Sequence, residues 1–389
     1  MKEEIVIAGM ARTPIGNFQG AFTGVPATTL GSHAIKAALS RANVKPDAVE
    51  EVLMGCVLPA GLGQAPARQA SLGAGLPKSA GCVTLNKVCG SGMKAVMLAH
   101  DSIAAGTNDV VVAGGMESMT NAPHLLPTGR SGIKYGHGEI LDHMAWDGLE
   151  DAYKKRTAMG VFAEMCAREH QFSRAAQDEF SMRSVTRAQA AIKDGLFRDE
   201  IAAFEVAGRK GPVTVADDEK PGTVDAGKIP SLRPAFEKDG TVTAGSSSAI
   251  SDGAAALVVA RASKAASVVA RIVGHATHSQ EPEWFTTAPV GSIAKLLEKI
   301  GWNARDVDLF EINEAFAVVP MAAMKELKIP AEKVNINGGA IALGHPIGCS
   351  GARLIVTLVH ALKATGGKRG VASLCIGGGE ATSLAVELV

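Results

Sequence analysis

Cys89-Gly90-Ser91-Gly92 opens a helical pattern of apolar residues, and a strand-like run at 110–115 follows it. About 260 residues later the same order returns, because Gly348-Cys349-Ser350-Gly351 opens a second helical pattern and a strand-like run at 370–375 comes next. Small residues at a helix start permit close backbone approach, and a repeated order of elements indicates an internal duplication. The sequence therefore predicts two similar halves in one chain.

The repeat extends outward from both stretches. A helical pattern at 29–41 precedes a strand-like run at 51–55, and residues 292–300 and 309–313 have the same order. Short Val/Ile-rich runs that alternate with helical patterns are typical of α/β proteins, whose sheets are covered by helices on both faces. Two such halves facing each other bring their glycine-rich strand and helix ends together, so we expect the functional cleft at their junction.

Charged residues, Gly and Pro become frequent between the two halves, in residues 119–248. We predict one helix there, at 173–191 with Ser173 as its N-cap, in a loop-rich insertion that covers the cleft. The predicted organisation is an N-terminal half at 1–118 completed by about 249–269, an inserted loop domain at 119–248, and a C-terminal half at 270–389.

Composition excludes several classes of protein. The 39 basic and 39 acidic residues cancel, so no basic field favours nucleic acid. The six cysteines form no Cys-x-x-Cys pair in a chain too long for a disulfide scaffold, which favours free thiols in a reducing compartment. Residues 1–14 lack the apolar core of a secretory signal, and no apolar stretch approaches the roughly 20 residues that span a bilayer. We expect a cytoplasmic protein that contacts no membrane.

Two residues held in glycine-rich turns suggest covalent chemistry. Cys89 precedes a helix start, where the helix dipole and a nearby imidazole favour the thiolate, so we expect a nucleophile rather than a small buried hydrophobe. His345 lies between Gly344 and Pro346 just before a helix. A lone histidine is more often structural, but one fixed in such a loop is a candidate base for activating Cys89.

Two further residues end strands. Cys375 is followed by three glycines at 377–379, which admit a ligand closely and present backbone N–H groups to an oxyanion. These glycines are not a phosphate loop, because no Gly-Lys-Ser/Thr follows them. Asn313 is either a site residue or simply the N-cap of the next helix.

Other polar residues have simpler interpretations. His275 and His278 have no acidic or histidine neighbours at metal-ligand spacing, so we expect them on an edge strand or loop and expect no metal site. We expect Arg12, Arg68 and Lys220 to be solvated charges.

Four motifs in this order resemble those of the thiolases, specifically the biosynthetic type: residues 86–93, 313–316, 337–351 and 375–380. The resemblance extends from residue 11 to the C-terminus. It implies a thiolase fold, which is a five-layered αβαβα sandwich of two similar halves with an inserted loop domain. This implied fold agrees with the repeat described above.

The resemblance also implies a role for each site residue. Cys89 would attack an acyl-CoA thioester and hold the acetyl group, and His345 would take its proton. Cys375 would remove the α-proton of a second acetyl-CoA, while His345 and a water held by Asn313 stabilise the enolate. The backbone amides of Cys89 and Gly377 would form the second oxyanion site.

The resemblance assigns the contacts to coenzyme A and the acyl group to Leu149, Met159, Ala244, Ser248 and Phe316. Lys220 is a further candidate, for the adenine end, because the segment 218–222 is shortened where the family often places an arginine. Ala158 departs from the family, which often has His there, and Cys349 departs from the Ala that is common in biosynthetic members.

The activity implied is the reversible Claisen condensation of two acetyl-CoA to acetoacetyl-CoA and CoA through an acetyl-cysteine intermediate. Coenzyme A enters as substrate, and no metal, redox or prosthetic cofactor is expected. A degradative 3-ketoacyl-CoA thiolase is the alternative, since Ala158 leaves room for longer chains. A protein that binds acyl-CoA without turnover is less favoured, and the second cysteine disfavours a ketoacyl synthase. The resemblance further implies a homotetramer that serves lipid metabolism.

Overall fold

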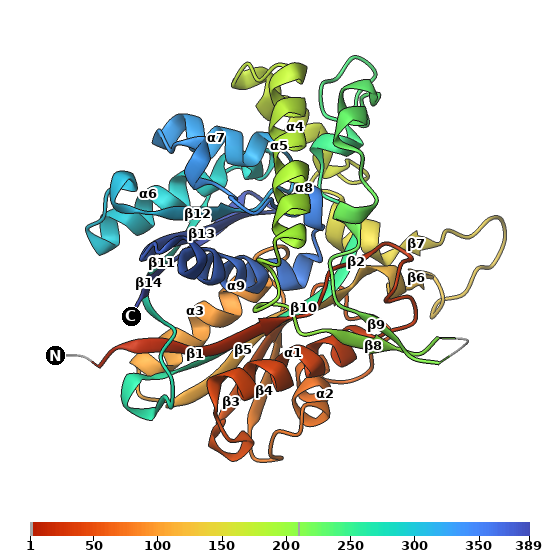
Figure 1. Ribbon diagram of the computed structural model, residues 1–389. Coiled ribbons are helices and arrows are strands. Elements are labelled where there is room, and N and C mark those ends of the chain that lie inside the picture. The colour runs from red at the N-terminus through yellow and green to blue at the C-terminus, as the bar shows by residue number, and fades with distance from the viewer. Residues whose placement is uncertain (1–2, 209–210) are drawn as a thin grey trace.

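The structure is a computed structural model that describes residues 3–208 and 211–389. Residues 1 and 2 of the N-terminal stretch considered above lie outside the described residues. One ten-stranded mixed sheet runs through the molecule (Figure 1). Its strands are β1 (Ile5–Arg12), β2 (Gly16–Asn17), β3 (Glu51–Gly55), β4 (Gly81–Leu85), β5 (Val110–Ser118), β10 (Ser251–Arg261), β11 (Ala270–Ser279), β12 (Leu309–Ile312), β13 (Arg369–Ile376) and β14 (Glu380–Leu388).

The two halves of this sheet have the same pairing pattern. In the first half β3 pairs in parallel with β5, β5 pairs antiparallel with β10, and β10 pairs antiparallel with β1. In the second half β12, β13, β14 and β11 repeat this order and these directions. A short ladder between β1 and β11, with Val6 opposite Arg271, joins the halves. The duplication predicted from the repeated stretches is confirmed by this topology.

Helices form three layers around the two halves of the sheet. The helices of the described residues are α1 (Ala27–Ala42), α2 (Pro66–Gly73), α3 (Ser91–Ala104), α4 (Met159–Glu169), α5 (Arg174–Lys193), α6 (Ala288–Ile300), α7 (Val318–Leu327), α8 (Ala340–Leu343) and α9 (Ile347–Thr365). Helices α1 and α2 cover the outer face of the first half, α6 covers the outer face of the second with α7 beside it, and α3 and α9 pack together between the halves (Figure 1). The layers are therefore helix, sheet, helix, sheet and helix.

Glycines of the two repeated stretches let the central helices meet. A Cβ on Gly92 would lie 2.8 Å from the backbone nitrogen of Ala352, and a Cβ on Gly351 would lie 2.4 Å from that of Met93. Real Cβ atoms do not approach so closely, so only glycine permits this crossing of α3 and α9. The crossing brings the start of α3, which follows Cys89, against the start of α9, which follows His345.

The segment between β5 and β10 contains more regular structure than the single helix predicted there. Besides α5 it includes α4 and two short hairpins, β6 (His124–Leu125) with β7 (Leu141–Asp142) and β8 (Phe204–Val206) with β9 (Val213–Val215). Ser173 caps α5 as predicted, since its side chain accepts from the backbone N–H of Ala176. Helix α4 was missed because Gly160 follows its first residue and no side-chain cap marks its start. The boundaries of the three predicted domains stay a prediction.

Helix α9 corrects the expectation that no apolar stretch is long enough to span a bilayer. Among the described helices, α9 is long and apolar enough to cross a bilayer, judged by length and composition alone. However, 83% of its 18-residue apolar window is buried inside the protein. Such burial between the two halves of the sheet is typical of a core helix. The small residues Gly348, Ser350 and Gly351 at its start obscure the apolar run in the sequence.

The prediction of three solvated charges was wrong. Arg12 is fully buried, and its guanidinium donates to Glu200 at 2.6 Å and to Asp218 at 2.7 Å. Arg68 is half-buried and donates to two backbone carbonyls, those of Ala80 and Lys78. Lys220 Nζ likewise donates to the carbonyl of Ile341 at 2.6 Å. Most of these partners are distant in sequence, so composition alone could not reveal them.

Candidate active site

A cavity of about 310 Å³ opens where the two halves and the inserted segment meet. Cys89 comes from the start of α3, Cys375 from the end of β13, and His345 from the turn before α9. All three line this one cavity, together with Gly377. Residues far apart in the sequence are thus brought to one apolar space, at the predicted junction.

The turn that presents Cys89 is strained. Val88, directly before it, has a φ of +45°, a left-handed conformation that β-branched residues rarely adopt. Asn86 Oδ1 accepts from the Val88 N–H at 2.8 Å, and Ser91 Oγ donates to the Val88 carbonyl at 2.7 Å. Strain of this kind costs about 1–3 kcal/mol and persists only where the surroundings impose it. The sequence did not reveal this feature, which turns the Cys89 thiol toward the cavity.

The protonation state of Cys89 corrects the expectation of a favoured thiolate. Burial raises the pKa of the thiol to about 11, although the backbone amides of Gly377 and of Cys89 itself act in the opposite direction. Desolvation of the charged form therefore outweighs the helix N-terminus. In the resting site the cysteine is a thiol, and it needs a base at the moment of attack.

The imidazole of His345 is oriented from both sides. Its Nδ1 lies 2.6 Å from Ser350 Oγ, and that hydroxyl donates to the carbonyl of Pro346 at 3.0 Å. Since the hydroxyl proton is used there, Nδ1 carries the ring proton and donates it to Ser350. The amide of Asn313 donates to the unprotonated Nε2 at 3.3 Å. Burial, with a smaller effect of Arg353, lowers the pKa of His345 to about 3, so the ring is neutral.

Asn313 is not the N-cap of the following helix, because α7 begins at Val318 and its N-cap is Ala317. Its side chain is fully buried and points its amide nitrogen at His345. Among the described residues no donor contacts Asn313 Oδ1. A buried carbonyl oxygen in this state has capacity for a water molecule.

Cys375 is buried beside Cys89. Its pKa lies well above the ordinary value, first because of burial and then because a negative charge on Cys89 would oppose its ionisation. The following turn requires glycine: Gly379 has a φ of +86°, and a Cβ there would lie 2.3 Å from the carbonyl oxygen of Gln280. The close turn places Gly377 on the cavity wall.

Most of the residues expected to contact coenzyme A or the acyl group line this cavity: Leu149, Met159, Ser248 and Phe316, with Ala158 beside them. Ala244 and Lys220 instead line a separate hollow of about 270 Å³. The segment 244–248 passes from one hollow to the other, and Ser248 N donates to the Ala315 carbonyl next to Phe316. Cys349 is buried in the core between the two halves of the sheet and does not line the cavity.

Glu117 is a structural residue of the site that the sequence interpretation missed. Its buried carboxylate accepts from the N–H groups of Val57, Leu58 and Gly348 at 2.9–3.1 Å. It therefore ties the end of β5 to the first turn of α9, next to His345. A carboxylate at a strand end that follows a Gly-Gly pair was the available signal.

Known proteins are similar along the whole chain. Residues 5–263 match the thiolase N-terminal domain and residues 266–388 the thiolase C-terminal domain. Acetyl-CoA acetyltransferase 2 of Arabidopsis thaliana is 53% identical, over 99% of this chain and 97% of its own, and acetyl-CoA acetyltransferase of Cupriavidus necator is 48% identical over 99% of each. The crystal structure of the Bacillus anthracis acetyl-CoA acetyltransferase is 41% identical with a TM-score of 0.96, over 100% of this chain and 99% of that one.

These similarities agree with the duplicated sheet and the five layers, and they confirm the fold inferred from the four motifs. The two matching domain models together span nearly the whole chain. The chain therefore belongs to the thiolase family.

Proposed function

We propose that the protein is an acetyl-CoA C-acetyltransferase, which condenses two acetyl-CoA to acetoacetyl-CoA and CoA in a reversible reaction. One observation carries this proposal: two thiols and a neutral imidazole with an unprotonated Nε2 line one cavity whose wall is mainly apolar. The names of the similar proteins from Arabidopsis thaliana and Cupriavidus necator support the same activity.

In the first half-reaction the Cys89 sulfur attacks the thioester carbonyl of acetyl-CoA, and His345 Nε2 takes the thiol proton. The amides of Cys89 and Gly377, which already point at the Cys89 sulfur, donate to the oxyanion of the tetrahedral intermediate. As this collapses, the C–S bond to CoA breaks and the leaving sulfur takes the proton of Cys375. Acetyl-Cys89, protonated His345 and a Cys375 thiolate remain, so protons and charge balance.

In the second half-reaction the Cys375 thiolate removes the α-proton of another acetyl-CoA. The enolate oxygen accepts from protonated His345 and from a water on Asn313 Oδ1, the buried oxygen that has no partner among the described residues. The enolate carbon attacks acetyl-Cys89, and the released Cys89 sulfur recovers its proton from His345. Both thiols and the neutral imidazole are then restored.

Aromatic rings at the acyl end favour short chains over the degradative alternative. Phe316 packs edge-on against Phe236, with ring centroids 5.8 Å apart, and against Phe285 at 6.4 Å. All three rings line the cavity, and we infer that they restrict the space for a longer acyl chain. Initial thiolysis rates over a series of chain lengths test this point: activity on 3-ketohexadecanoyl-CoA equal to that on acetoacetyl-CoA would favour the degradative enzyme.

The proposal includes a homotetramer in the cytoplasm that serves lipid metabolism, uses coenzyme A only as substrate and carries no prosthetic group. Support for assembly comes from β4, which ends the sheet and, among the described strands, pairs with β3 alone; Val83 on it is 44% exposed. Sedimentation equilibrium tests the assembly, with a monomer as the contrary result. Imaging of the tagged protein in cells tests the location.

Mass spectrometry after mixing with acetyl-CoA tests the proposed division of roles. We expect one acetyl group on Cys89 in the native protein and none in Cys89→Ala. Cys375→Ser should still become acetylated but should lose exchange of the acetyl-CoA α-protons with deuterated solvent. An unacetylated Cys375→Ser protein that binds acyl-CoA would contradict this division, and a native protein that binds acyl-CoA without any adduct would be a non-catalytic carrier.

A further inference from the structure

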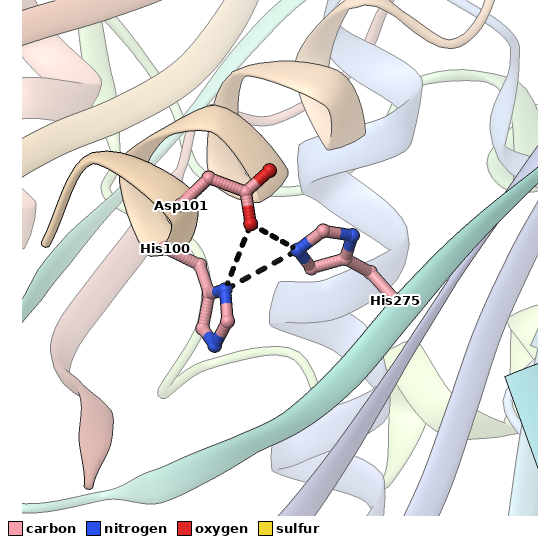
Figure 2. Close-up of side chains that lie close together, drawn as sticks. All are labelled: His100, Asp101 and His275. Carbon is pink, nitrogen blue, oxygen red and sulfur yellow. Dashed lines mark hydrogen bonds and ion pairs between the residues drawn. The ribbon is translucent and has the colours of Figure 1, made fainter. Parts of the chain in front are cut away.

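Three polar side chains meet outside the acyl cavity, where α3 packs across the sheet (Figure 2). His100 and Asp101 are neighbours on α3, and His275 comes from β11. His275 Nε2 lies 2.9 Å from Asp101 Oδ1 and 3.2 Å from His100 Nδ1, and these last two atoms are 3.3 Å apart. None of the three residues lines the acyl cavity, so this cluster is a separate feature.

The structure also corrects the interpretation of His275 as a histidine of an edge strand or loop without suitable neighbours. Strand β11 lies inside the sheet, between β14 and β1. The two neighbours of the His275 ring, His100 and Asp101, come from α3, more than 170 residues earlier in the chain. Spacing along the sequence could not reveal a cluster that only the packing of helix on sheet creates.

All three facing atoms can hold either a proton or a metal ion. With a proton on His275 Nε2 alone, His100 Nδ1 and the carboxylate of Asp101 face each other as two acceptors. With a proton on His100 Nδ1 alone, His275 Nε2 and the carboxylate do so at 2.9 Å. With both protons, Asp101 Oδ1 accepts from both rings. A cation bound by all three atoms is the alternative to these protons, and it removes the contacts between facing acceptors.

The distances suit a small divalent metal ion. Bonds of about 2.1 Å from Zn²⁺ to imidazole nitrogen and carboxylate oxygen, at angles between tetrahedral and octahedral values, hold ligand atoms roughly 3.0–3.4 Å apart. Nε2 of His275 is the atom nearest to both other ligand atoms, and the neutral imidazole is the form that binds a metal ion. The Asp101 side chain is 51% exposed, which leaves an open side for water as a fourth ligand.

Nearby positive charges are already engaged. Lys299 Nζ donates to the backbone carbonyl of His275 rather than to its ring. Arg271 pairs with Glu4 and Glu387, and Arg261 pairs with Asp109, so both guanidinium groups beside the cluster are neutralised. Glu3 lines the same surface hollow as His100, together with Glu4 and the two paired arginines.

We propose that His100, Asp101 and His275 bind one Zn²⁺ ion, which links α3 of the first half to β11 of the second. Helix α3 begins directly after the turn that holds Cys89, so the ion stabilises the packing of that helix rather than taking part in acyl transfer. Two histidines and one carboxylate are borderline ligands that zinc accepts readily.

Equilibrium dialysis of the chelator-treated full chain against Zn²⁺ tests the proposal. Asp101→Asn keeps the side-chain shape at a partly exposed position, and His100→Ala removes a second ligand from the surface of α3. His124→Ala, on the exposed part of β6, is the matched control. We expect one Zn²⁺ per native chain with a higher melting temperature, affinity weakened at least about tenfold in both cluster variants, and native behaviour in the control.

Co²⁺ in place of Zn²⁺ separates this cluster from the thiols. Cobalt held by histidine and carboxylate gives visible ligand-field bands without the near-ultraviolet charge transfer that thiolate ligands produce. We expect such bands in the native protein and in Cys89→Ala, but not in Asp101→Asn. Equal Zn²⁺ binding by the native protein and both cluster variants, absence of binding by the native protein, or thiolate charge transfer as the only cobalt signal would each overturn the proposal. Acyl transfer enters none of these measurements.

Discussion

Nδ1 of His345 lies 2.6 Å from Oγ of Ser350, one helical turn further along the chain. Because the serine hydroxyl donates to the Pro346 carbonyl, it accepts the Nδ1 proton and so fixes one tautomer of the ring. Nε2 is then the unprotonated nitrogen, and it can serve as the base that the partly buried Cys89 thiol requires. Ser350 acts through His345 and is a positioning residue.

Ser350→Ala should lower kcat by about tenfold to a hundredfold, because both tautomers of His345 then become populated and only one can take a proton from Cys89. KM for acetoacetyl-CoA should change little, since the fully buried hydroxyl does not line the cavity. Ser181→Ala is the control: Ser181 is equally buried and makes the same bond to the carbonyl four residues earlier, on α5. A parallel loss of kcat in both variants would point to a merely structural role.

Much of the fold could be predicted from local patterns. The strand predicted at 51–55 is observed with the same ends. The two glycine-rich stretches begin equivalent helices, because both halves require small residues where α3 and α9 cross. Cys89, His345 and Cys375 were predicted to share a site, and they line one cavity. The backbone conformation of a glycine-containing turn depends on the residues of the turn itself, so it can be predicted from the local sequence.

Contacts made across the fold could not be predicted. The two acidic partners of Arg12 lie 188 and 206 residues away in the sequence. His275 and Asp101 are separated by 174 residues. The protonation state of Cys89 also depends on burial, which a helix-start pattern does not measure. Patterns thus located the reactive groups, whereas packing determined their charges.

The resting thiol of Cys89 should be visible in its alkylation kinetics. With a pKa of about 11, the thiolate fraction rises roughly tenfold for each unit of pH between 7 and 9, and the rate of carbamidomethylation by iodoacetamide should rise with it. Peptide mass spectrometry separates Cys89 from the partly exposed Cys82. A rate that is already constant near pH 7 would instead indicate a stable ion pair with His345.

Protonation of His345 should not limit activity at mildly acidic pH. Its pKa of about 3 lies below the ordinary 6.5, so the ring remains a free base down to about pH 4. The profile of kcat/KM for acetoacetyl-CoA thiolysis, corrected for ionisation of CoA, should show no acid limb near pH 6.5. An acid limb near that pH that disappears in His345→Asn, measured on its residual activity, would contradict the buried neutral ring.

The lowered pKa of His360 should make the free energy of unfolding decrease as pH falls. Burial and the charges of Lys363 and Arg41 lower its pKa to about 4, whereas Asp199 acts in the opposite direction. The unfolded chain binds the extra proton between about pH 6.5 and 4, so this residue's contribution to stability declines as pH falls through that window. His360→Met should lose about 2 kcal/mol less than the native protein between pH 7 and pH 5, measured by urea unfolding. Equal losses in both proteins would refute this assignment.

Glycine at position 351 should be essential for the central packing. A Cβ there would lie 2.4 Å from the backbone nitrogen of Met93, and neither helix can shift without moving the turn before it. Gly351→Ala should therefore destabilise the protein by about 1–3 kcal/mol and also lower kcat, because α9 would carry His345 away from Cys89. Gly222→Ala is the control, since a Cβ at that position meets no atom within 4 Å. Native stability and rate in Gly351→Ala would show that the repeated glycines do not set the distance between the two halves.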